Sequence, residues 1–331
     1  MTPFITQLRE NAAREAKTIV LPEAVDERIL RAAAFLDEQN ICRVILAVSE
    51  DRGRALADSF GIRLPESVLF SEPGKGENVE KFIHQLYERR RDRGMTEDLA
   101  AELVRQPLYW AASLVAQGEA DGSVAGAMNT TADVLRAALQ VVGLQAGSEV
   151  VSSVFMMSWE DGRVFTYGDC AVVPYPTAPQ LASIAIDSAQ THQDLTGEEA
   201  RVALLSFSTK GSAEHERIEL VQEALETVKR KKSLLAVDGE LQFDAAFVEH
   251  IGRGKAPESP VAGKANVFIF PNLDAGNISY KITERLGGAT ATGPIIQGFA
   301  KPMNDVSRGC KWEDVVDTAA VCALMSESAD D

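Results

Sequence analysis

Short apolar runs alternate with amphipathic segments along most of the chain, and this alternation predicts strands connected by helices. The runs at 17–22, 43–48 and 202–207 have the length of a buried strand. Residues 79–94 instead carry apolar side chains three and four positions apart, which is the spacing of one helix face. Because this order of elements is typical of a parallel sheet covered by helices on both faces, the pattern predicts an α/β fold.

The middle of the chain departs from this order, because two strand-like segments follow each other directly. Residues 149–157 and 163–167 flank Asp161 and Gly162, and an Asp-Gly pair is a strong hairpin signal. We therefore expect an antiparallel ribbon in a second subdomain. Further helices are expected at 27–39, 50–59, 180–190, 214–229, 277–286 and 312–325, and further strands at 265–270 and 293–298.

Length and charge narrow the class of protein. A chain of 331 residues with 45% hydrophobic and 25% charged residues predicts a globular protein of about two domains. Its net charge of −16 disfavours a nucleic-acid-binding protein and repels an anionic membrane surface. A phosphate-bearing ligand would therefore have to be bound by a local cluster of positive groups.

The ends of the chain and its cysteines favour a cytoplasmic protein. The first residues lack the pattern of a secretory signal, and no apolar run reaches the length of a transmembrane helix. The four cysteines form no CxxC pair, and the four histidines lack the spacing of a metal site. We expect reduced thiols and no bound metal.

The densest group of candidate functional residues lies in segment 301–310, just before the last predicted helix. Ser307 and Gly309 flank Arg308 in a turn that leads into the helix N-terminus. Free amides, a hydroxyl and a guanidinium together form a cradle for an anion. Asp314 follows within the first two turns, either as a catalytic carboxylate or as the acidic residue that any helix favours at its positive end.

A second candidate is the strand-to-helix connection that begins at Asn129. Thr130 or Thr131 is expected to cap the following helix, with Asp133 in its first turn and Arg136 one turn along. This arrangement is either an ordinary helix cap with a solvated arginine or a phosphate site at the helix start.

Two further basic features carry weaker signals. Lys210 lies in a polar loop after strand 202–207, but it precedes the single glycine, so the loop is not a GxxxxGK[ST] motif. The chain also lacks a GxGxxG motif after a strand. The predicted helix at 79–93 ends in four arginines. They either form a solvent-exposed face at the C-terminal end of the helix or bind a polyanion.

Together these segments resemble the phosphate acetyltransferase family over nearly the whole chain. The resemblance rests on the stretches NTTADVLRAALQ, GDCAVVPYPTAPQLASIAIDSA, LLSFSTKGSA, VFIFPNLDAGNISYKITERLGGA and GPIIQGFAKPMNDVSRGC. It implies a two-domain α/β/α architecture with a central cleft, similar to that of isocitrate and isopropylmalate dehydrogenases. The implied domains are a discontinuous one, 1–147 with 295–331, and a second one, 148–294, which carries the antiparallel ribbon and the contact of a homodimer.

The resemblance also implies an activity, the reversible transfer of an acetyl group between coenzyme A and inorganic phosphate. Coenzyme A is then a substrate, no cofactor is needed, and neither a nucleic acid nor a membrane is a partner. The regulatory domains that precede this region in long bacterial forms would be absent. The implied catalytic residues are Ser307, Arg308 and Asp314. The candidate residues for binding coenzyme A and phosphate are Arg136, Arg285, Arg90, Thr130, Thr131, Asn304 and Lys210.

The chemistry of these residues suits a direct transfer in a ternary complex. Asp314 would take the proton of the coenzyme A thiol, whose ordinary pKa is about 8.5, while Arg308 and Ser307 stabilise charge on the acyl oxygen. A rival route is an acetyl-enzyme on Cys310.

Which arginine of the run 89–91 binds substrate stays open. Two alternatives to acetyl transfer also stay open. The substrate could carry a butyryl or propionyl group, or the chain could be a non-catalytic coenzyme A module like that of malic enzymes. A decarboxylating dehydrogenase is disfavoured, because the clustered aspartates of its metal site are missing.

Overall fold

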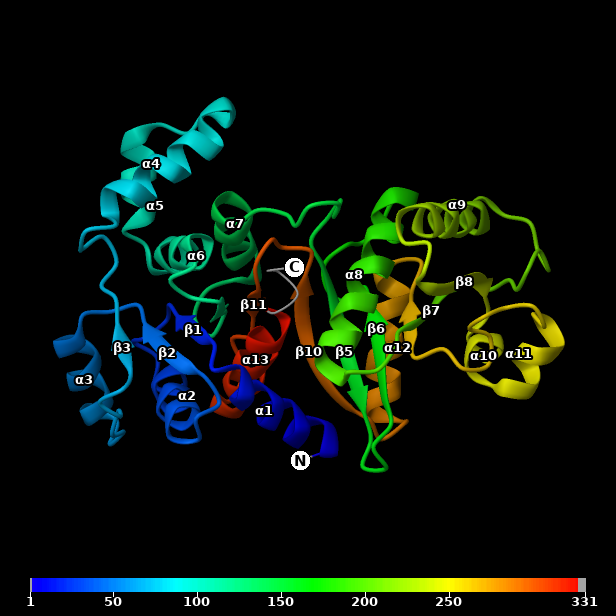
Figure 1. Ribbon diagram of the computed structural model, residues 1–331, viewed down its shortest axis with the longest axis horizontal. Helices are drawn as coiled ribbons and strands as arrows, with labels where there is room; N and C mark the ends of the chain where they lie inside the picture. Colours follow the sequence, from blue (N-terminus) through cyan, green and yellow to red (C-terminus); the bar gives the residue numbers. More distant parts are fainter. Residues whose placement is uncertain (1, 327–331) are drawn as a thin grey trace. The chain divides into compact units, whose positions relative to one another are not determined.

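The computed structural model describes residues 2–326, and the chain divides into two compact units. The terminal unit comprises 7–143 together with the described residues from Phe299 onward. The middle unit comprises Leu144–Gly298 together with the described residues up to Thr6. Each is an α/β structure with its own sheet, which confirms the predicted fold class (Figure 1).

The division differs from the expected domain boundaries at three places, the first of which is the start of the middle unit at Leu144 instead of residue 148. The strand at Thr290–Gln297 pairs with the middle sheet as far as Gln297, which lies opposite Ser152. The chain therefore leaves the middle unit only after Gly298, not at residue 294. Residues 2–6 group with the middle unit as well, where Thr2 Oγ1 lies 3.1 Å from Ser158 Oγ.

The described part of the terminal unit has five strands, β1 (Thr18–Leu21), β2 (Arg43–Leu46), β3 (Leu69–Phe70), β4 (Gly122–Ala125) and β11 (Met303–Asp305). All are parallel, in the order β11-β4-β1-β2-β3. The residues of β1 and β4 are buried throughout, as expected for central strands covered on both faces.

The strand order of the terminal sheet reverses between β1 and β4. From β1 the chain steps one way to β2, through α2 (Glu27–Glu38). After β4 the chain passes through α7 (Thr131–Val141) and then the middle unit, and it returns as β11 on the other side of β4. Since such crossovers are right-handed, these two helices cover opposite faces of the sheet. A point of reversal leaves a crevice at the carboxyl ends of the strands, where α/β proteins usually bind ligands.

The other helices of the terminal unit are α1 (Pro3–Glu15), whose first residues belong to the middle unit, α3 (Glu50–Ser59), α4 (Val79–Arg90) with the 3-10 turn η1 (Arg91–Arg93), α5 (Glu97–Val104), α6 (Pro107–Gln117) and α13 (Trp312–Met325). Figure 1 shows α4 and α5 as a pair that projects from this unit. The helices predicted at 50–59 and 312–325 are confirmed.

The described part of the middle unit holds a six-stranded sheet made of β5 (Ser152–Ser158), β6 (Val164–Gly168), β7 (Arg201–Leu205), β8 (Ala236–Leu241), β9 (Val267–Ile269) and β10 (Thr290–Gln297). The order is β10-β5-β6-β9-β7-β8, with β10, β5 and β6 antiparallel and β6, β9, β7 and β8 parallel. The predicted hairpin is confirmed, since Ser158 of β5 pairs with Val164 of β6.

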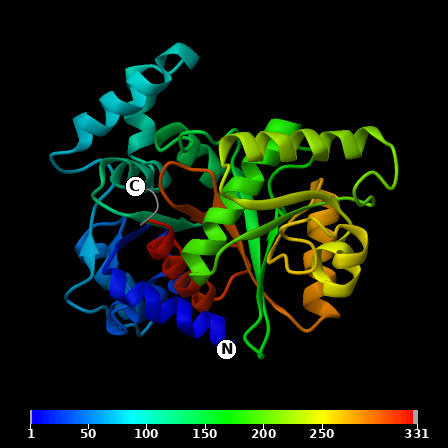
Figure 2. The same cartoon turned by 45° about the vertical axis from the view of Figure 1, so that its right-hand side comes forward.

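Alternate residues of the middle sheet enter two separate cores. Val202 and Leu204 of β7 pack with α8 (Ala178–Thr196) and α9 (Glu216–Lys231). The intervening Ala203 and Leu205 belong to the opposite core, with residues of α10 (Phe243–Phe247) and α12 (Leu273–Arg285). This is the period-2 alternation of a strand. The short helix α11 (Glu249–Lys255) follows α10 in the chain. Figure 2 shows the green and yellow-green helices α8 and α9 on one side of these strands and the orange α12 on the other.

Several elements differ from the expectations. The loop expected before the last helix contains β11, and the sequence reading gave no prediction for α1, α5, α6, α10, α11 or β8. These are mostly short elements without a distinctive hydrophobic period. Among residues 2–326, none of the helices is both long and apolar enough to cross a membrane.

Candidate functional site

Three loops follow the carboxyl ends of β1, β4 and β11, at the point where the terminal sheet reverses its strand order. The loop after β1 carries Glu23, and the loop after β4 runs from Gly126 to Thr130. The loop after β11 carries Ser307 and Arg308. Two of the three loops therefore contain residues that the sequence singles out, and all three lie on neighbouring strands.

Glu23 fixes the loop after β4. Its carboxylate accepts hydrogen bonds from the backbone amides of Ala127 (2.7 Å), Met128 (2.9 Å) and Asn129 (2.8 Å). The side-chain amide of Asn129 donates a fourth, at 2.7 Å. The glutamate is 4% exposed, so its charge is compensated by these donors in place of water.

Arg28 connects the loop after β4 with the loop after β11. Its Nη2 donates to the carbonyl oxygen of Ala127 at 2.7 Å. Its Nη1 donates to the carbonyl oxygens of Arg308 at 2.7 Å and Cys310 at 3.1 Å. Its Nε and Nη2 also bind both oxygens of Asp26, at 2.9 and 2.7 Å, so a carboxylate orients the guanidinium plane.

The turn before α13 brings the three predicted catalytic residues to one helix start. Ser307 and Arg308 are exposed, and Ser307 Oγ accepts the amide of Gly309 at 3.2 Å. Asp314 lies in the first turn of α13, and its Oδ2 accepts the amide of Lys311 at 2.8 Å. Within residues 2–326 the guanidinium of Arg308 has no hydrogen-bond or ion-pair partner, so it is available to an anion.

The start of α7 is capped by a predicted residue. Thr130 is the N-cap, and its Oγ1 accepts the amide of Asp133 at 3.2 Å. Arg136 forms an ion pair with Asp133 at 2.6 Å. The hydrogen bond from Thr130, and then Arg136, lower the pKa of Asp133. The predicted cap at Thr130 is confirmed, and Arg136 is held at the helix surface one turn from the cap.

Asp305 is a buried carboxylate behind this helix start. Its Oδ2 accepts the hydroxyl of Thr131, whereas its Oδ1 has no partner among the described residues. Burial raises the pKa of Asp305 to about 6, which the hydrogen bond from Thr131 partly opposes. A side chain at Gly126, where φ is +103°, would collide with this carboxylate, so the approach of the two strands requires glycine.

The arginine run at the end of α4 separates into partnered and free side chains. Arg89 donates to the carbonyl of Val142 at 2.7 Å, and Arg91 pairs with Glu88 at 2.8 Å. The guanidinium of Arg90 has no hydrogen-bond or ion-pair partner within the described chain. This observation favours Arg90 as the ligand-binding residue of the run.

Arg90 and Arg136 share one electrostatic environment. Burial raises the pKa of Tyr109, and the charges of Arg136 and Arg90 both oppose this rise. Both guanidinium groups therefore lie within electrostatic reach of one tyrosine hydroxyl, whose other contact is Gln140 Oε1 at 3.0 Å. Asp133, which is paired with Arg136, acts on the same tyrosine in the opposite sense, so Arg90 is the one of the two arginines without a partner among the described residues.

Three of the predicted residues are not part of the loops and helix ends described above. Asn304, on β11, is 1% exposed, and its side-chain amide donates to Cys322 Sγ at 3.1 Å inside the terminal unit. Lys210 and Arg285 belong to the middle unit. Lys210 pairs with Asp238 there and donates to the carbonyl of Gly239 at 2.8 Å.

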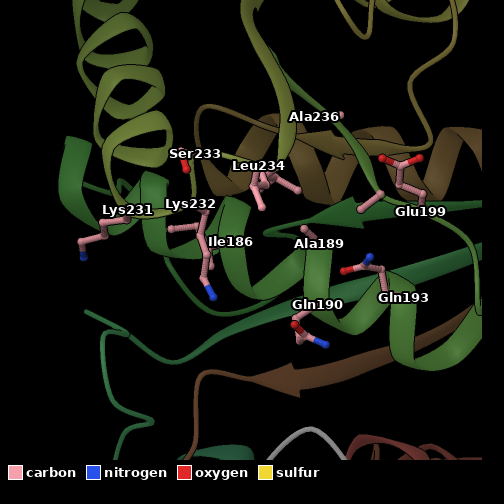
Figure 3. Close-up of a pocket in the computed structure, with 12 residues that line it drawn as sticks. Ile186, Ala189, Gln190, Gln193, Glu199, Lys231, Lys232, Ser233, Leu234 and Ala236 are labelled. Atoms are coloured by element: carbon pink, nitrogen blue, oxygen red, sulfur yellow. The ribbon is translucent and has the colours of Figure 1, made fainter. Parts of the chain in front are cut away.

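Two cavities bear on the position of the site. One of about 570 Å³ includes Glu23 and Asn129 in its wall and lies beside the loops described above. Another of about 420 Å³ lies in the middle unit and contains none of the predicted residues. Figure 3 shows this second cavity, with Leu234 facing the helix that carries Ile186, Ala189, Gln190 and Gln193.

In residues 2–326, no group of three or more His, Cys, Asp or Glu side chains is arranged to hold a metal ion. The positive groups of the candidate site are guanidinium side chains and helix amides.

Comparisons with known proteins identify the family. A family model described as "Phosphate acetyl/butaryl transferase" matches residues 3–323. The chain belongs to this family. It is 44% identical to the phosphate acetyltransferase of Acetivibrio thermocellus, over 98% of both chains.

Solved structures agree. A phosphotransacetylase from Streptococcus pyogenes matches with a TM-score of 0.93 and 38% identity, over 99% of this chain and 100% of that one. A phosphotransacetylase from Staphylococcus aureus matches with a TM-score of 0.90 and 38% identity, over 98% of both chains. The family resemblance and the α/β architecture expected from the sequence are thereby confirmed.

The sequence reading missed Glu23, Asp26 and Arg28. Glu23 lies in the loop after the first strand, Asp26 is the N-cap of α2 and Arg28 lies in its first turn, in a segment without a glycine-rich motif. The loop residues that Glu23 and Arg28 bind lie about a hundred or more positions along the chain, such as Ala127 and Arg308. The only local signal was an acidic N-cap, Asp26, before a helix.

Proposed function

We propose that this protein catalyses the reversible transfer of an acetyl group between coenzyme A and inorganic phosphate. The observation that carries the proposal is the turn before α13. There an exposed hydroxyl and an unpartnered guanidinium precede a helix N-terminus, one turn from the carboxylate of Asp314. Relatives of known sequence that span the same length are phosphate acetyltransferases, which supports the same reaction.

In this proposal Asp314 acts as the general base. Its Oδ2 is bound to the amide of Lys311, and its Oδ1 has no hydrogen bond within the described residues. Oδ1 takes the proton of the coenzyme A thiol, and the sulfur then attacks the carbonyl carbon of acetyl phosphate. As the carbon–sulfur bond forms, the carbonyl oxygen gains negative charge. The bond to the phosphate oxygen then breaks, and inorganic phosphate leaves with both electrons.

Arg308 and Ser307 bind the developing negative charge. A preorganised donor of this kind contributes about 3–4 kcal/mol to the transition state. Arg308 is suited to this role because its side chain is free while its backbone is held by Arg28. The amides at the start of α13 and the hydroxyl of Ser307 add neutral donors to the same turn.

Arg90 and Arg136 bind the phosphate groups of the substrates, helped by the capped start of α7 at Thr130 and Thr131. Both arginines act on Tyr109, which supports a common anion-binding surface. Arg285 is an additional candidate on the middle unit, with 79% of its side chain exposed. We assign no role in binding to Asn304, which is buried, and a loop-holding role to Lys210, which is paired with Asp238.

The proposed reaction needs no cofactor, since coenzyme A is a substrate and guanidinium groups supply the positive charge. We also propose a cytoplasmic enzyme. All four cysteines are free thiols, which agrees with a reducing compartment.

The test is an assay that follows the loss of free thiol when the protein is mixed with acetyl phosphate and coenzyme A. We expect turnover in the unmodified protein, and in reverse the release of coenzyme A from acetyl-coenzyme A when phosphate is added. Arg308→Ala should lower kcat about 100- to 1,000-fold, and Asp314→Asn about 100-fold or more.

Arg31→Ala is the matched control, because Arg31 is an exposed arginine of the terminal unit that pairs only with Glu27. It should keep its activity. Absence of thiol loss in the unmodified protein, or full turnover by the Arg308 variant, would refute the proposed function.

We further propose that the protein is a homodimer formed through the middle unit. Ile278 and Ile282 of α12 and the C-cap residue Leu286 follow one another at helical spacing and are 56%, 53% and 85% exposed. A contiguous apolar stripe of this kind on the surface is typical of an interaction site, and a second copy of the chain would cover it.

Light scattering coupled to size-exclusion chromatography tests the assembly. The unmodified protein should elute with the mass of two chains, and Ile282→Lys should elute with the mass of one. Leu234→Lys is the control, because Leu234 is 98% exposed in the same unit but lies outside this stripe. A monomeric mass for the unmodified protein would contradict the proposal.

A further inference from the structure

We propose that Arg28 is a positioning residue of this enzyme, which sets the geometry of the Ser307–Arg308 turn relative to the loop after β4. The inference rests on the proposed function. It concerns a residue that does not contact the reacting atoms and acts on them through the backbone of another loop.

The guanidinium of Arg28 uses all of its nitrogens in hydrogen bonds. Nε binds Asp26, Nη1 binds the carbonyls of Arg308 and Cys310, and Nη2 binds Asp26 and the carbonyl of Ala127. Each nitrogen of the fork therefore has a partner. Lysine has a single nitrogen and cannot make this set of bonds from one position.

The hydrogen bonds from Arg28 hold the Ser307–Arg308 turn at the residue where its backbone is least restrained. Nη1 holds the carbonyls on both sides of Gly309, the residue of the turn with no side chain to restrain it. The turn would otherwise be anchored mainly by the bond from the Cys310 amide to the Ser307 carbonyl, at 2.8 Å. With its backbone held from behind, the side chains of Ser307 and Arg308 project from a fixed base.

The loop after β4, which Arg28 also binds, is itself held in place. Nη2 binds the carbonyl of Ala127, while Glu23 holds the amides of Ala127, Met128 and Asn129 from its own position after β1. The loop that leads to the anion-binding start of α7 and the turn with the catalytic residues thus share one rigid frame. A displacement of about 1 Å in such a frame can lower a rate about 100-fold.

Asp26 orients the fork and gives a second way to disturb it. It is the N-cap of α2, and its Oδ1 accepts the amide of Arg28 at 2.8 Å. The hydrogen bond from Arg28 lowers the pKa of Asp26. Asp26→Asn keeps the cap but weakens the ion pair, so it should loosen the same frame with less risk to folding.

The experiment is a double-mutant cycle between Arg28 and Arg308. Arg28→Met, Arg28→Lys and Asp26→Asn are each made in the unmodified protein and in Arg308→Ala, and thiol loss is followed with coenzyme A and acetyl phosphate. In the unmodified background Arg28→Met should lower kcat about 10- to 100-fold, with KM for coenzyme A changed less than about threefold. The kcat of Arg28→Lys should lie close to that of Arg28→Met.

In the Arg308→Ala background the same Arg28 substitution should lower kcat by less than about threefold, because its effect passes through Arg308. A merely structural role would give the same fall in both backgrounds. Arg31→Met, on the same helix, is the matched control and should keep its activity in both. Thermal unfolding of each variant reports its folded fraction. Asp26→Asn should lower kcat in the same direction, and it replaces Arg28→Met if that variant does not fold.

Two results would overturn the inference alone. They are turnover that Arg28→Met leaves unchanged, and an equal loss with and without the Arg308 side chain. Absence of turnover in the unmodified protein would instead refute the proposed function, and with it this role for Arg28.

Discussion

Single side chains in the terminal unit carry several tasks at once. Arg28 binds three backbone carbonyls and one carboxylate, and Glu23 accepts four N–H donors. Both are placed where a loop without regular structure has to hold a defined shape. Charged groups suit this task because hydrogen bonds to a charge are stronger than those between neutral groups.

Cys310 lies two residues from Arg308 and offers an alternative, covalent route. It is 8% exposed, and burial raises the pKa of its thiol although Arg28 lies nearby. A protonated thiol is a poor nucleophile. Cys310→Ala should therefore retain activity within about threefold in the thiol assay, and no acetylated protein should be trapped on denaturation. A loss as large as that of Asp314→Asn would favour an acetyl-enzyme.

We expect the buried carboxyl of Asp305 to make the free energy of unfolding depend on pH. The carboxyl has a pKa of about 6 when folded, raised from 3.8 by burial. Between these values the native protein keeps a proton that the unfolded chain releases, so the free energy of unfolding falls as pH rises through this window. As pH rises from ~4 to ~7, the free energy of unfolding of Asp305→Asn should increase by about 1–3 kcal/mol relative to that of the unmodified protein. Urea denaturation at each pH measures this difference.

The control for this prediction is Asp58→Asn, which alters an exposed carboxylate of the same unit. Its difference from the unmodified protein should stay constant with pH. If the Asp305 variant shows an equally constant difference, the buried carboxyl does not titrate as we infer.

At the scale of elements, the ends of helices and strands carry the chemistry. The starts of α7 and α13 both follow a parallel strand and both present free amides at the same sheet edge. Such ends are decided largely by local sequence, because a capping side chain bonds to amides two or three positions along.

The cap of α7 can be tested directly. Thr130→Ala removes the bond to the amide of Asp133 and should lower the free energy of unfolding by about 1 kcal/mol. Thr130→Ser keeps the hydroxyl and should lie close to the unmodified protein. Chemical denaturation measures both, and equal stability of Thr130→Ala and the unmodified protein would mean that the cap contributes nothing.

At the scale of the whole molecule, each unit has its own sheet and core. In the middle unit Phe268 is fully buried and lies against the rings of Phe165, Tyr167, Phe243 and Phe247. Removal of a buried aromatic ring costs about 3–5 kcal/mol, a large share of the stability of a domain.

Phe268→Ala should therefore increase hydrogen exchange across Leu144–Gly298 and leave the strands of the terminal unit protected. Phe207→Ala is the control, because Phe207 is 60% exposed in the same unit. An equal rise in exchange across both units would show that they unfold as one cooperative body.

Elements with a clear hydrophobic period were predictable from the sequence. The helix at 50–59 has the predicted bounds, and the hairpin around Asp161 and Gly162 has the predicted form. The short strand β11 was not expected, because three residues after a proline show no period of their own. It becomes a strand only because Met303–Asp305 pair in parallel with β4.

Local sequence was enough to predict the α/β class, the cap of α7 and the grouping of Ser307, Arg308 and Asp314 at one helix start, because helices, strands and caps depend on residues a few positions apart. That Arg28 and Glu23 hold the loops around them, and that Asn304 faces the core, became visible only in the folded chain. Side-chain bonds between residues about a hundred or more positions apart arise from the order of strands in the sheet, and no local pattern in the chain records that order.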